Sequence, residues 1–163
     1  MALVPIIMGS RTDLSHAQAI AGALQSLGIQ SEIRVASAHK VTRYLLDMLA
    51  TYEADPQPKV YITVAGRSNA LSGVVDANVT APVIACPPYS DRFGGADLFS
   101  SLRMPSGVAP AVVLEPAAAA LLAAKILALA DPTLRERVAH LQREAAQQII
   151  ADDESLQKGE SAI

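Results

Sequence analysis

The chain has 163 residues, of which 51% are hydrophobic, 4% aromatic and 18% charged. Thirteen Lys and Arg residues against 16 Asp and Glu give a net charge of −3, and no basic stripe indicates a nucleic-acid partner. This length suits one domain that buries its own core without metals or disulfides, and the surplus of Ala, Val, Leu and Ile predicts further burial between subunits.

Apolar runs of strand length alternate with helical stretches along the chain. We expect strands at 3–8, 32–35, 60–64, 83–85 and 111–114. Helices are expected at 13–27, 41–52, 69–77, 96–102, 117–130 and 133–151. Strands without polar alternation are typical of a parallel sheet that is covered on both faces. The pattern therefore predicts an α/β fold, a three-layer open parallel sheet of the flavodoxin-like type with a long C-terminal helix.

The last expected helix repeats apolar residues at a helical period. They are Leu134, Val138, Leu141, Ala145 and Ile149. This face should pack across a neighbouring subunit or against its own domain. The polar stretch 152–163 has no comparable period and is expected to fray. We therefore predict a single domain over 3–151 followed by a polar tail.

Three further features bear on the compartment. The single cysteine, Cys86, cannot form an internal disulfide and suits a reducing cytosol as a small buried residue, although a reactive thiol is the alternative. No export signal opens the sequence. The apolar stretch 117–130 is too short to span a bilayer and contains Lys125. We expect a cytoplasmic protein that does not bind membranes.

The first candidate site follows the first expected strand. Gly9 would allow close approach of the backbone, Ser10 could donate its hydroxyl to a phosphate, and Asp13 could accept from sugar hydroxyls. Helix starts favour anions because their N–H groups are unpaired and the helix dipole is positive there. Ser and Asp before an apolar helix are also ordinary N-caps, and this interpretation stays open.

The second candidate site repeats this design after the second strand. Ser37 is again placed as a phosphate donor, and His39 and Lys40 add a titratable imidazole and a cation. Ligands collect beyond the carboxyl ends of parallel strands, so both turns can contribute to one pocket. His39 could then move a proton on a phosphorylated small molecule, although a lone histidine can also be structural. His16 and His140 lie inside expected helices and have no such setting.

A third segment, Ala65-Gly66-Arg67-Ser68-Asn69-Ala70-Leu71-Ser72-Gly73, follows the strand at 60–64. Together with the two turns, Cys86-Pro87-Pro88 and Ser100-Ser101-Leu102-Arg103-Met104-Pro105-Ser106-Gly107, it resembles the family of aminoimidazole ribonucleotide (AIR) carboxylases and N-carboxy-AIR mutases of purine synthesis. The resemblance runs over about residues 3–130 in unbroken order.

Two details resemble the branch that carboxylates AIR directly with CO2. Mutases generally carry Arg after the histidine and a second histidine in the glycine-rich loop, where this chain has Lys40 and Ala70. Both details are similar to the carboxylase domain of the animal bifunctional enzyme and to its stand-alone bacterial counterparts. The resemblance therefore implies the carboxylase activity alone, acting on AIR and CO2 without a metal or other cofactor.

The resemblance also implies roles for individual residues. Ser10, Ser37 and Lys40 would hold the phosphate, Asp13 would bind the ribose, and His39 would be the catalytic base. The base would contact the aminoimidazole ring, and this ring would lie along the backbone of the third segment. The residues of that segment in this role are Gly66, Arg67, Ser68, Asn69, Ala70 and Leu71. Ser68 and Asn69 could hold the product carboxylate. Arg67 could meet a carboxylate or form a structural pair across a subunit boundary.

Two alternatives and an assembly state complete these expectations. The chain could be an N-carboxy-AIR mutase of the same pathway, or a non-catalytic nucleotide-binding module, because a fold and a phosphate pocket do not by themselves imply chemistry. Family members assemble as oligomers with sites near subunit junctions. The resemblance implies a homo-oligomer, with an octamer favoured over a tetramer, in which the segment 104–107 closes a site, either its own or a neighbour's.

Overall fold

The computed structural model describes residues 2–159 and contains one five-stranded parallel sheet. Its strands are β1 (Leu3–Met8), β2 (Gln30–Val35), β3 (Tyr61–Val64), β4 (Val83–Ala85) and β5 (Ala111–Val112). They lie in the order β2-β1-β3-β4-β5, and every neighbouring pair is parallel. This is the order of the flavodoxin-like fold, so the predicted class is confirmed.

The helices agree with the expected ones except at some of their ends. They are α1 (Leu14–Ser26), α2 (Thr42–Glu53), α3 (Leu71–Asp76), α4 (Phe99–Leu102), α5 (Pro116–Leu127) and α6 (Pro132–Gln157), with 3-10 segments η1 (Arg11–Asp13) and η2 (Arg92–Leu98). The helix expected at 96–102 is divided between η2 and α4. Before it, Phe93, Gly94 and Gly95 adopt positive φ values of 54°, 61° and 79°, which a right-handed helix cannot include.

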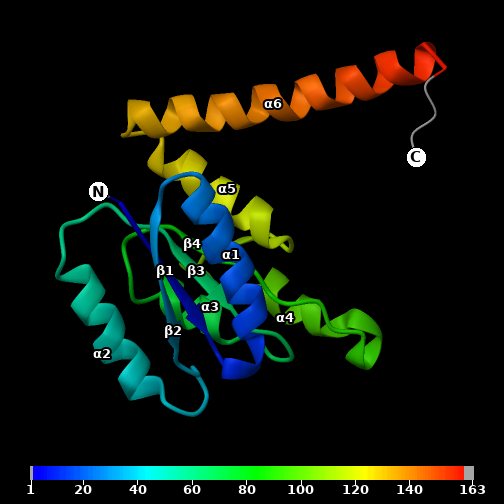
Figure 1. The fold of residues 1–163 in the computed structure, drawn as a ribbon. Helices are drawn as coiled ribbons and strands as arrows, with labels where there is room; N and C mark the ends of the chain where they lie inside the picture. The colour runs from blue at the N-terminus through cyan, green and yellow to red at the C-terminus, as the bar shows by residue number, and fades with distance from the viewer. Residues whose placement is uncertain (1, 160–163) are drawn as a thin grey trace.

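Two apolar layers hold the helices against the sheet. Along β1, Val4, Ile6 and Met8 face the layer that contains α1 and α5, whereas Leu3 and Ile7 face the layer that contains α2 and α3. Successive side chains of a strand point to opposite faces, so one apolar run serves both layers. Each fully buried Leu or Ile contributes about 1.5–3 kcal/mol relative to an exposed one. Figure 1 shows these helices on the two sides of the sheet.

The sheet order creates the position of the site. The chain moves from β1 to the edge strand β2 and then back past β1 to β3, so the connections after β1 and β3 leave in opposite directions. Ligands in open parallel sheets bind at such a point, beyond the carboxyl ends of the strands. Both candidate turns and the third segment begin at these ends.

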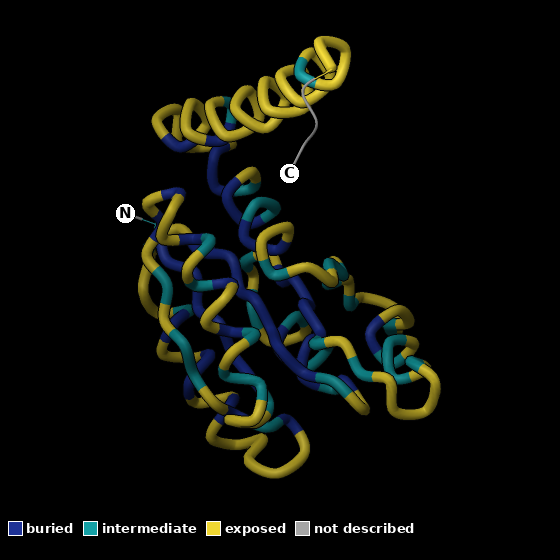
Figure 2. Tube along the Cα trace, turned by 45° about the vertical axis from the view of Figure 1, so that its right-hand side comes forward, coloured by how far each residue is buried: buried dark blue, intermediate teal, exposed yellow. Residues whose placement is uncertain are grey.

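Helix α6 projects away from the sheet, and only its first turns are buried on the domain (Figures 1 and 2). Leu134 and Val138 are 4% and 6% exposed, but Leu141 and Ile149 are 40% and 69% exposed. Only the first part of the predicted apolar face therefore packs against its own domain. No helix within residues 2–159 combines the length and the apolar character that crossing a membrane requires.

The predicted end of this helix was wrong. We expected it to end at Ala151, but α6 continues to Gln157. The segment is rich in residues with adequate helix propensity, and Gln148 donates to Asp152 one turn later at 2.7 Å. The helix ends before Gly159, whose φ of 76° is the left-handed conformation that glycine readily adopts. Residues 160–163 of the predicted tail lie outside the described residues.

Candidate functional site

A cavity of about 760 Å³ lies at the carboxyl ends of the strands. Both candidate turns and the start of the third segment line it, so the prediction that the two turns share one pocket is confirmed. The predicted site residues that line it are Gly9, Ser10, Asp13, Ser37, His39, Lys40, Gly66, Arg67, Ser68 and Leu71. Asn69 and Ala70 line a separate hollow instead. The remaining lining residues are Thr12, Ala38, Ala65, Pro88, Tyr89, Ser90 and Arg92.

The turn after β1 is held by its own serine. Ser10 Oγ accepts from the Thr12 N–H at 3.3 Å and from the Thr12 hydroxyl at 2.9 Å. The Gly9 N–H donates to the Val64 carbonyl at 2.9 Å and fastens the turn to the end of β3. The capping interpretation of Ser10 is therefore confirmed. A hydroxyl that accepts these bonds keeps its own hydrogen, so Ser10 can still donate to an anion in the cavity.

Asp13 occupies the N-cap position of α1, yet its side chain makes no capping hydrogen bond. Its carboxylate is half-buried at the cavity wall, and burial raises its pKa above the ordinary value. His16 and Arg67 oppose that rise electrostatically, which places both side chains near the carboxylate. A carboxylate that does not cap its helix can accept hydrogen bonds from a ligand.

The turn after β2 repeats the serine cap. Ser37 Oγ accepts from the Lys40 N–H at 3.3 Å, and the Ser37 carbonyl accepts from the Val41 N–H at 3.0 Å. His39 and Lys40 are exposed on this turn at the cavity. Within residues 2–159 neither side chain has a hydrogen bond or an ion pair. The imidazole and the ammonium group are thus available to a ligand.

The third segment is held by hydrogen bonds to α4, which lies much later in the chain. The Asn69 amide Nδ2 donates to Ser101 Oγ at 2.9 Å, and its Oδ1 accepts from the Ser72 N–H at 3.2 Å. The Asn69 N–H also donates to Ser100 Oγ at 2.9 Å. Asn69 is only 4% exposed. Its side chain therefore fixes the loop, while Gly66, Arg67 and Ser68 line the cavity. A direct role of Asn69 in holding a ligand stays a prediction.

The segment 104–107 packs on α3 of its own chain. A Cβ atom at Gly73 would lie 3.1 Å from Met104 Sδ, so the absence of a side chain there lets Met104 approach the helix. The Ala109 N–H donates to Asp76 Oδ2 at 2.7 Å and fixes the end of this segment. Residues 104–107 do not line the cavity of their own chain. Their predicted role at a neighbour's site stays a prediction.

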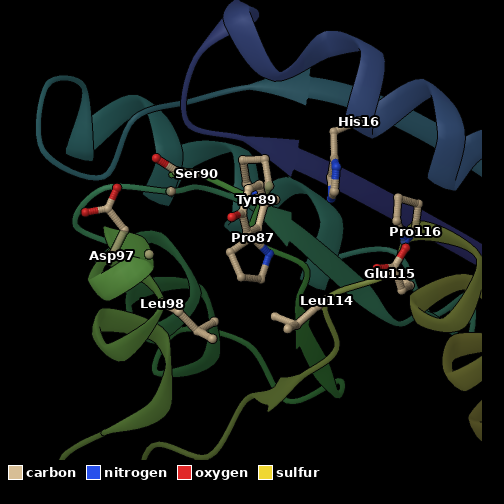
Figure 3. Close-up of a pocket in the computed structure, with 12 residues that line it drawn as sticks. His16, Pro87, Tyr89, Ser90, Asp97, Leu98, Leu114, Glu115 and Pro116 are labelled. Atoms are coloured by element: carbon tan, nitrogen blue, oxygen red, sulfur yellow. The ribbon is translucent and has the colours of Figure 1, made fainter. Parts of the chain in front are cut away.

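A smaller cavity of about 390 Å³ adjoins the first and shares Gly66, Pro88, Tyr89 and Ser90 with it. Figure 3 shows the His16 side chain extending from α1 toward this cavity. Sequence reasoning assigned His16 no role.

The ring of His16 is fixed by a buried thiol. His16 Nε2 lies 3.3 Å from Cys86 Sγ. Burial lowers the pKa of His16, while interactions with Cys86, Asp13 and Glu115 oppose the change. Cys86 is fully buried, as expected, and burial raises its pKa to about 12, with Glu115 acting in the same direction. The thiol therefore stays protonated and unreactive at neutral pH.

Sequence reasoning missed the rim that follows β4. Tyr89, Ser90 and Arg92 line the main cavity, and Tyr89 is 90% exposed. Because Cys86-Pro87-Pro88 directly follows a strand of the same parallel sheet, these residues were bound to reach the same edge. That topological signal was present in the sequence.

Comparison with known proteins agrees with this geometry. Residues 3–148 match the family model of AIR carboxylase. The phosphoribosylaminoimidazole carboxylase of Treponema denticola is 54% identical over 156 residues, which cover 96% of this chain and 98% of that protein. The enzyme of the same name from Archaeoglobus fulgidus is 54% identical over 93% of this chain and 83% of its own length.

A solved structure extends the comparison to the fold. The crystal structure of Treponema denticola PurE superposes with a TM-score of 0.95 over 96% of this chain and 99% of that chain, at 54% sequence identity. The match includes nearly the whole described fold. The family resemblance found in the sequence motifs is confirmed: the chain belongs to the AIR carboxylase family.

Proposed function

We propose that this protein is a phosphoribosylaminoimidazole carboxylase, which reversibly converts AIR and CO2 to carboxyaminoimidazole ribonucleotide (CAIR) in purine synthesis. The observation that carries the proposal is one cavity in which an unpartnered His39 lies with Ser10, Asp13, Ser37 and Lys40. Relatives at 54% identity bear the same enzyme name. The cavity offers donors for a phosphate, an acceptor for a sugar and a base for a proton.

The anionic end of the nucleotide is assigned to the two capped turns. Ser10 and Ser37 donate hydroxyl hydrogens to the phosphate, and Lys40 supplies a positive charge without a fixed geometry. Asp13 accepts from the ribose hydroxyls, because its carboxylate is not used as a helix cap. This arrangement directs the aminoimidazole ring toward the backbone between Gly66 and Leu71.

The chemical step forms a carbon–carbon bond and releases a proton. The electron-rich ring carbon of AIR attacks the carbon of CO2, and the adduct carries both the new carboxylate and the original hydrogen on a tetrahedral carbon. His39 removes that hydrogen as a proton, and the electron pair of the broken C–H bond restores the aromatic ring. In the reverse direction the protonated imidazole returns the proton and CO2 leaves.

The new carboxylate is assigned to the third segment. Ser68 and the loop N–H groups can donate hydrogen bonds to it in a partly enclosed site. Arg67 keeps two possible roles, a carboxylate contact or a pair across a subunit boundary. Its φ of 55° is uncommon for a residue with a side chain, and its charge already acts on Asp13.

Substrate choice tests the proposal. Purified protein is given AIR with dissolved CO2 in one assay and N-carboxy-AIR in another, both without ATP, and CAIR formation is followed. We expect CAIR from AIR and CO2 and little from N-carboxy-AIR. The opposite preference would establish the mutase alternative. Binding of AIR without turnover in either assay would establish a non-catalytic module.

We also propose that the protein works as a homo-oligomer, an octamer rather than a tetramer. Supporting this, the outer part of α6 exposes Leu141, Ile149, Ile150 and Leu156 on a helix that its own domain leaves uncovered. Burial of such residues in a partner interface stabilises association. Light scattering should give the mass of eight chains, and Ile149→Asp should lower it. A monomeric wild-type protein would contradict this proposal.

A cytoplasmic location is the last part of the proposal. Cys86 is a fully buried free thiol with a raised pKa, which suits a reducing compartment. Fractionation of cells that produce the protein should recover it with cytoplasmic markers. Recovery in an exported fraction would contradict the assignment.

A further inference from the structure

Arg92 is a cation of the main cavity that the proposed function has not used. It lines the cavity from η2, the segment that follows β4. Within residues 2–159 its guanidinium has no hydrogen bond and no ion pair, although Asp91 precedes it in the chain. Lys40 has the phosphate as its assigned partner and Arg67 has Asp13 as an electrostatic neighbour. Arg92 alone among these cations is left without one.

The three cations of the cavity face different anionic groups once the ligand is bound. Lys40, Arg67 and Arg92 face a single carboxylate, that of Asp13. A phosphate monoester brings about −1.5 to −2 charges near pH 7. CAIR carries one carboxylate more than AIR. With Lys40 assigned to the phosphate and Arg67 acting on Asp13, Arg92 is the cation left for the carboxylate that distinguishes the product from the substrate.

The position of Arg92 favours the carboxylate over the phosphate. Arg92 follows Pro88, Tyr89 and Ser90, and a Cβ atom on Gly66 would lie 3.6 Å from Pro88 Cγ, so this rim leans on Gly66. The smaller cavity continues on the same side, and Figure 3 shows Tyr89 and Ser90 at that rim. Neither Arg92 nor the residues assigned to the phosphate line that smaller cavity, so the link between Arg92 and the third segment is the contact of Pro88 with Gly66.

The local backbone holds Arg92 at the cavity edge. Its N–H donates to Ser90 Oγ at 3.3 Å, and the Gly94 N–H donates to the Asp91 carbonyl at 3.1 Å. The left-handed residues Phe93, Gly94 and Gly95 then turn the chain toward α4. This turn places Arg92 among the lining residues and leaves Phe93 84% exposed outside them.

The geometry points to Arg92 as a product-binding residue that contacts the carboxylate of CAIR. This inference rests on the proposed function and adds a second donor group to the loop N–H groups near Ser68. A guanidinium presents paired N–H donors that match the two oxygens of a carboxylate, which an ammonium cannot do. Arg92 therefore contributes to the affinity for CAIR and to the stabilisation of charge on the incoming CO2 oxygens.

Equilibrium binding to AIR and to CAIR tests the inference. Calorimetry with AIR is done without CO2, and CAIR is titrated in a His39→Asn background in which the proposed proton transfer is blocked. We expect Arg92→Gln to raise the Kd of CAIR about tenfold, as for the loss of one exposed charge-assisted contact, and to leave the Kd of AIR within about twofold. Arg92→Lys should give an intermediate loss.

Arg11→Gln is the matched control, because Arg11 is an exposed cation beside Ser10 that does not line the cavity. Both affinities should stay within about twofold in that variant. Equal losses for AIR and CAIR in Arg92→Gln would assign Arg92 to the phosphate and overturn the inference, as would no loss for either. A wild-type protein that neither binds nor converts AIR would instead refute the proposed function.

Discussion

The two turns that close the cavity use the same cap and carry different chemistry. At the end of β1, Ser10 caps the turn and Asp13 lies half-buried near His16 and Arg67. At the end of β2, Ser37 caps the turn, and His39 and Lys40 are exposed without partners among the described residues. The same cap therefore occurs in two different corners of the cavity. The sugar-binding corner, with Ser10 and Asp13, is suited to holding a sugar, and the proton-transfer corner, with Ser37, His39 and Lys40, is suited to moving a proton.

The two histidines near these turns express the same contrast. His16 is fixed against Cys86 Sγ at 3.3 Å, and burial lowers its pKa. His39 has no protein partner in the described chain and lines the cavity. Position at a strand end with a free ring, rather than the residue type, is what marks a candidate base.

The largest effect should come from the proton-transfer corner. His39→Asn should lower kcat about 10²–10⁴-fold, the usual contribution of a positioned base, with the Kd of AIR within about threefold. Steady-state kinetics and calorimetry measure the two quantities. His140→Asn, on exposed α6, should change neither. If the His39→Asn enzyme kept more than a tenth of the wild-type kcat, His39 would not be the base, and the two corners would not differ in their chemistry.

The sugar-binding corner should respond in affinity instead. Asp13→Asn should raise the KM for AIR about 10–100-fold, because it removes a charged acceptor of hydrogen bonds, with a smaller change in kcat. The exposed Asp47 on α2 supplies the control, since Asp47→Asn lies away from the cavity. If Asp13→Asn lowered kcat and left KM unchanged, the proposed sugar contact would be wrong.

The caps themselves give a smaller and symmetric prediction. Ser10→Ala and Ser37→Ala should each weaken AIR binding about tenfold and cost about 1 kcal/mol of stability, because each hydroxyl serves both the turn and the phosphate. Calorimetry and urea denaturation measure the two losses. Ser15→Ala, on the exposed face of α1, should show neither. A loss of stability without a loss of affinity would leave the serines as caps alone.

The sequence was sufficient for the parts of the site that follow a strand directly. Ser10 and Ser37 lie within two residues of β1 and β2, so the edge of the sheet where they lie follows from the strand assignment. The family resemblance placed Asn69 in the cavity, but its amide donates to Ser101 Oγ on the distant α4, and Asn69 lines a separate hollow. A partner so far along the chain leaves no local signal.

The sequence predicts that the rim after β4 lies at this edge of the sheet, but it does not predict the shape of that rim or the end of α6. Directly after Arg92 the chain turns at Phe93, whose φ of 54° is a conformation that no rule of local propensity favours in phenylalanine. The last described turns of α6 lack an apolar period, and most of their residues are exposed. A repeat of apolar residues marks the buried face of a helix. An exposed helix has no such face, so only the helix propensity of its residues can predict where it ends.

The smallest expected effect concerns the pH dependence of stability at His16. Burial lowers its pKa in the folded protein, so the unfolded chain binds a proton first as the pH falls through about 6.5. As the pH falls from 7 toward the pKa of His16 in the folded protein, the free energy of unfolding therefore decreases. The contribution of His16 has this sign over the whole of that range. Because His16 is only partly buried, the loss should be less than about 1 kcal/mol.

The change in the free energy of unfolding with pH, compared between wild type and a His16 variant, separates the protonation of His16 from the packing of its ring. Urea denaturation of wild-type and His16→Gln protein at fixed concentration, at pH 7 and pH 5.5, gives four free energies of unfolding. The variant should lose less stability between the two pH values than the wild type, whatever its stability at pH 7. Asp13, whose pKa is raised, acts with the opposite sign and is present in both proteins. If wild-type and His16→Gln protein lost the same stability between the two pH values, the pKa of His16 would not be lowered by folding. The contrast between His16 and His39 would then rest on their positions alone.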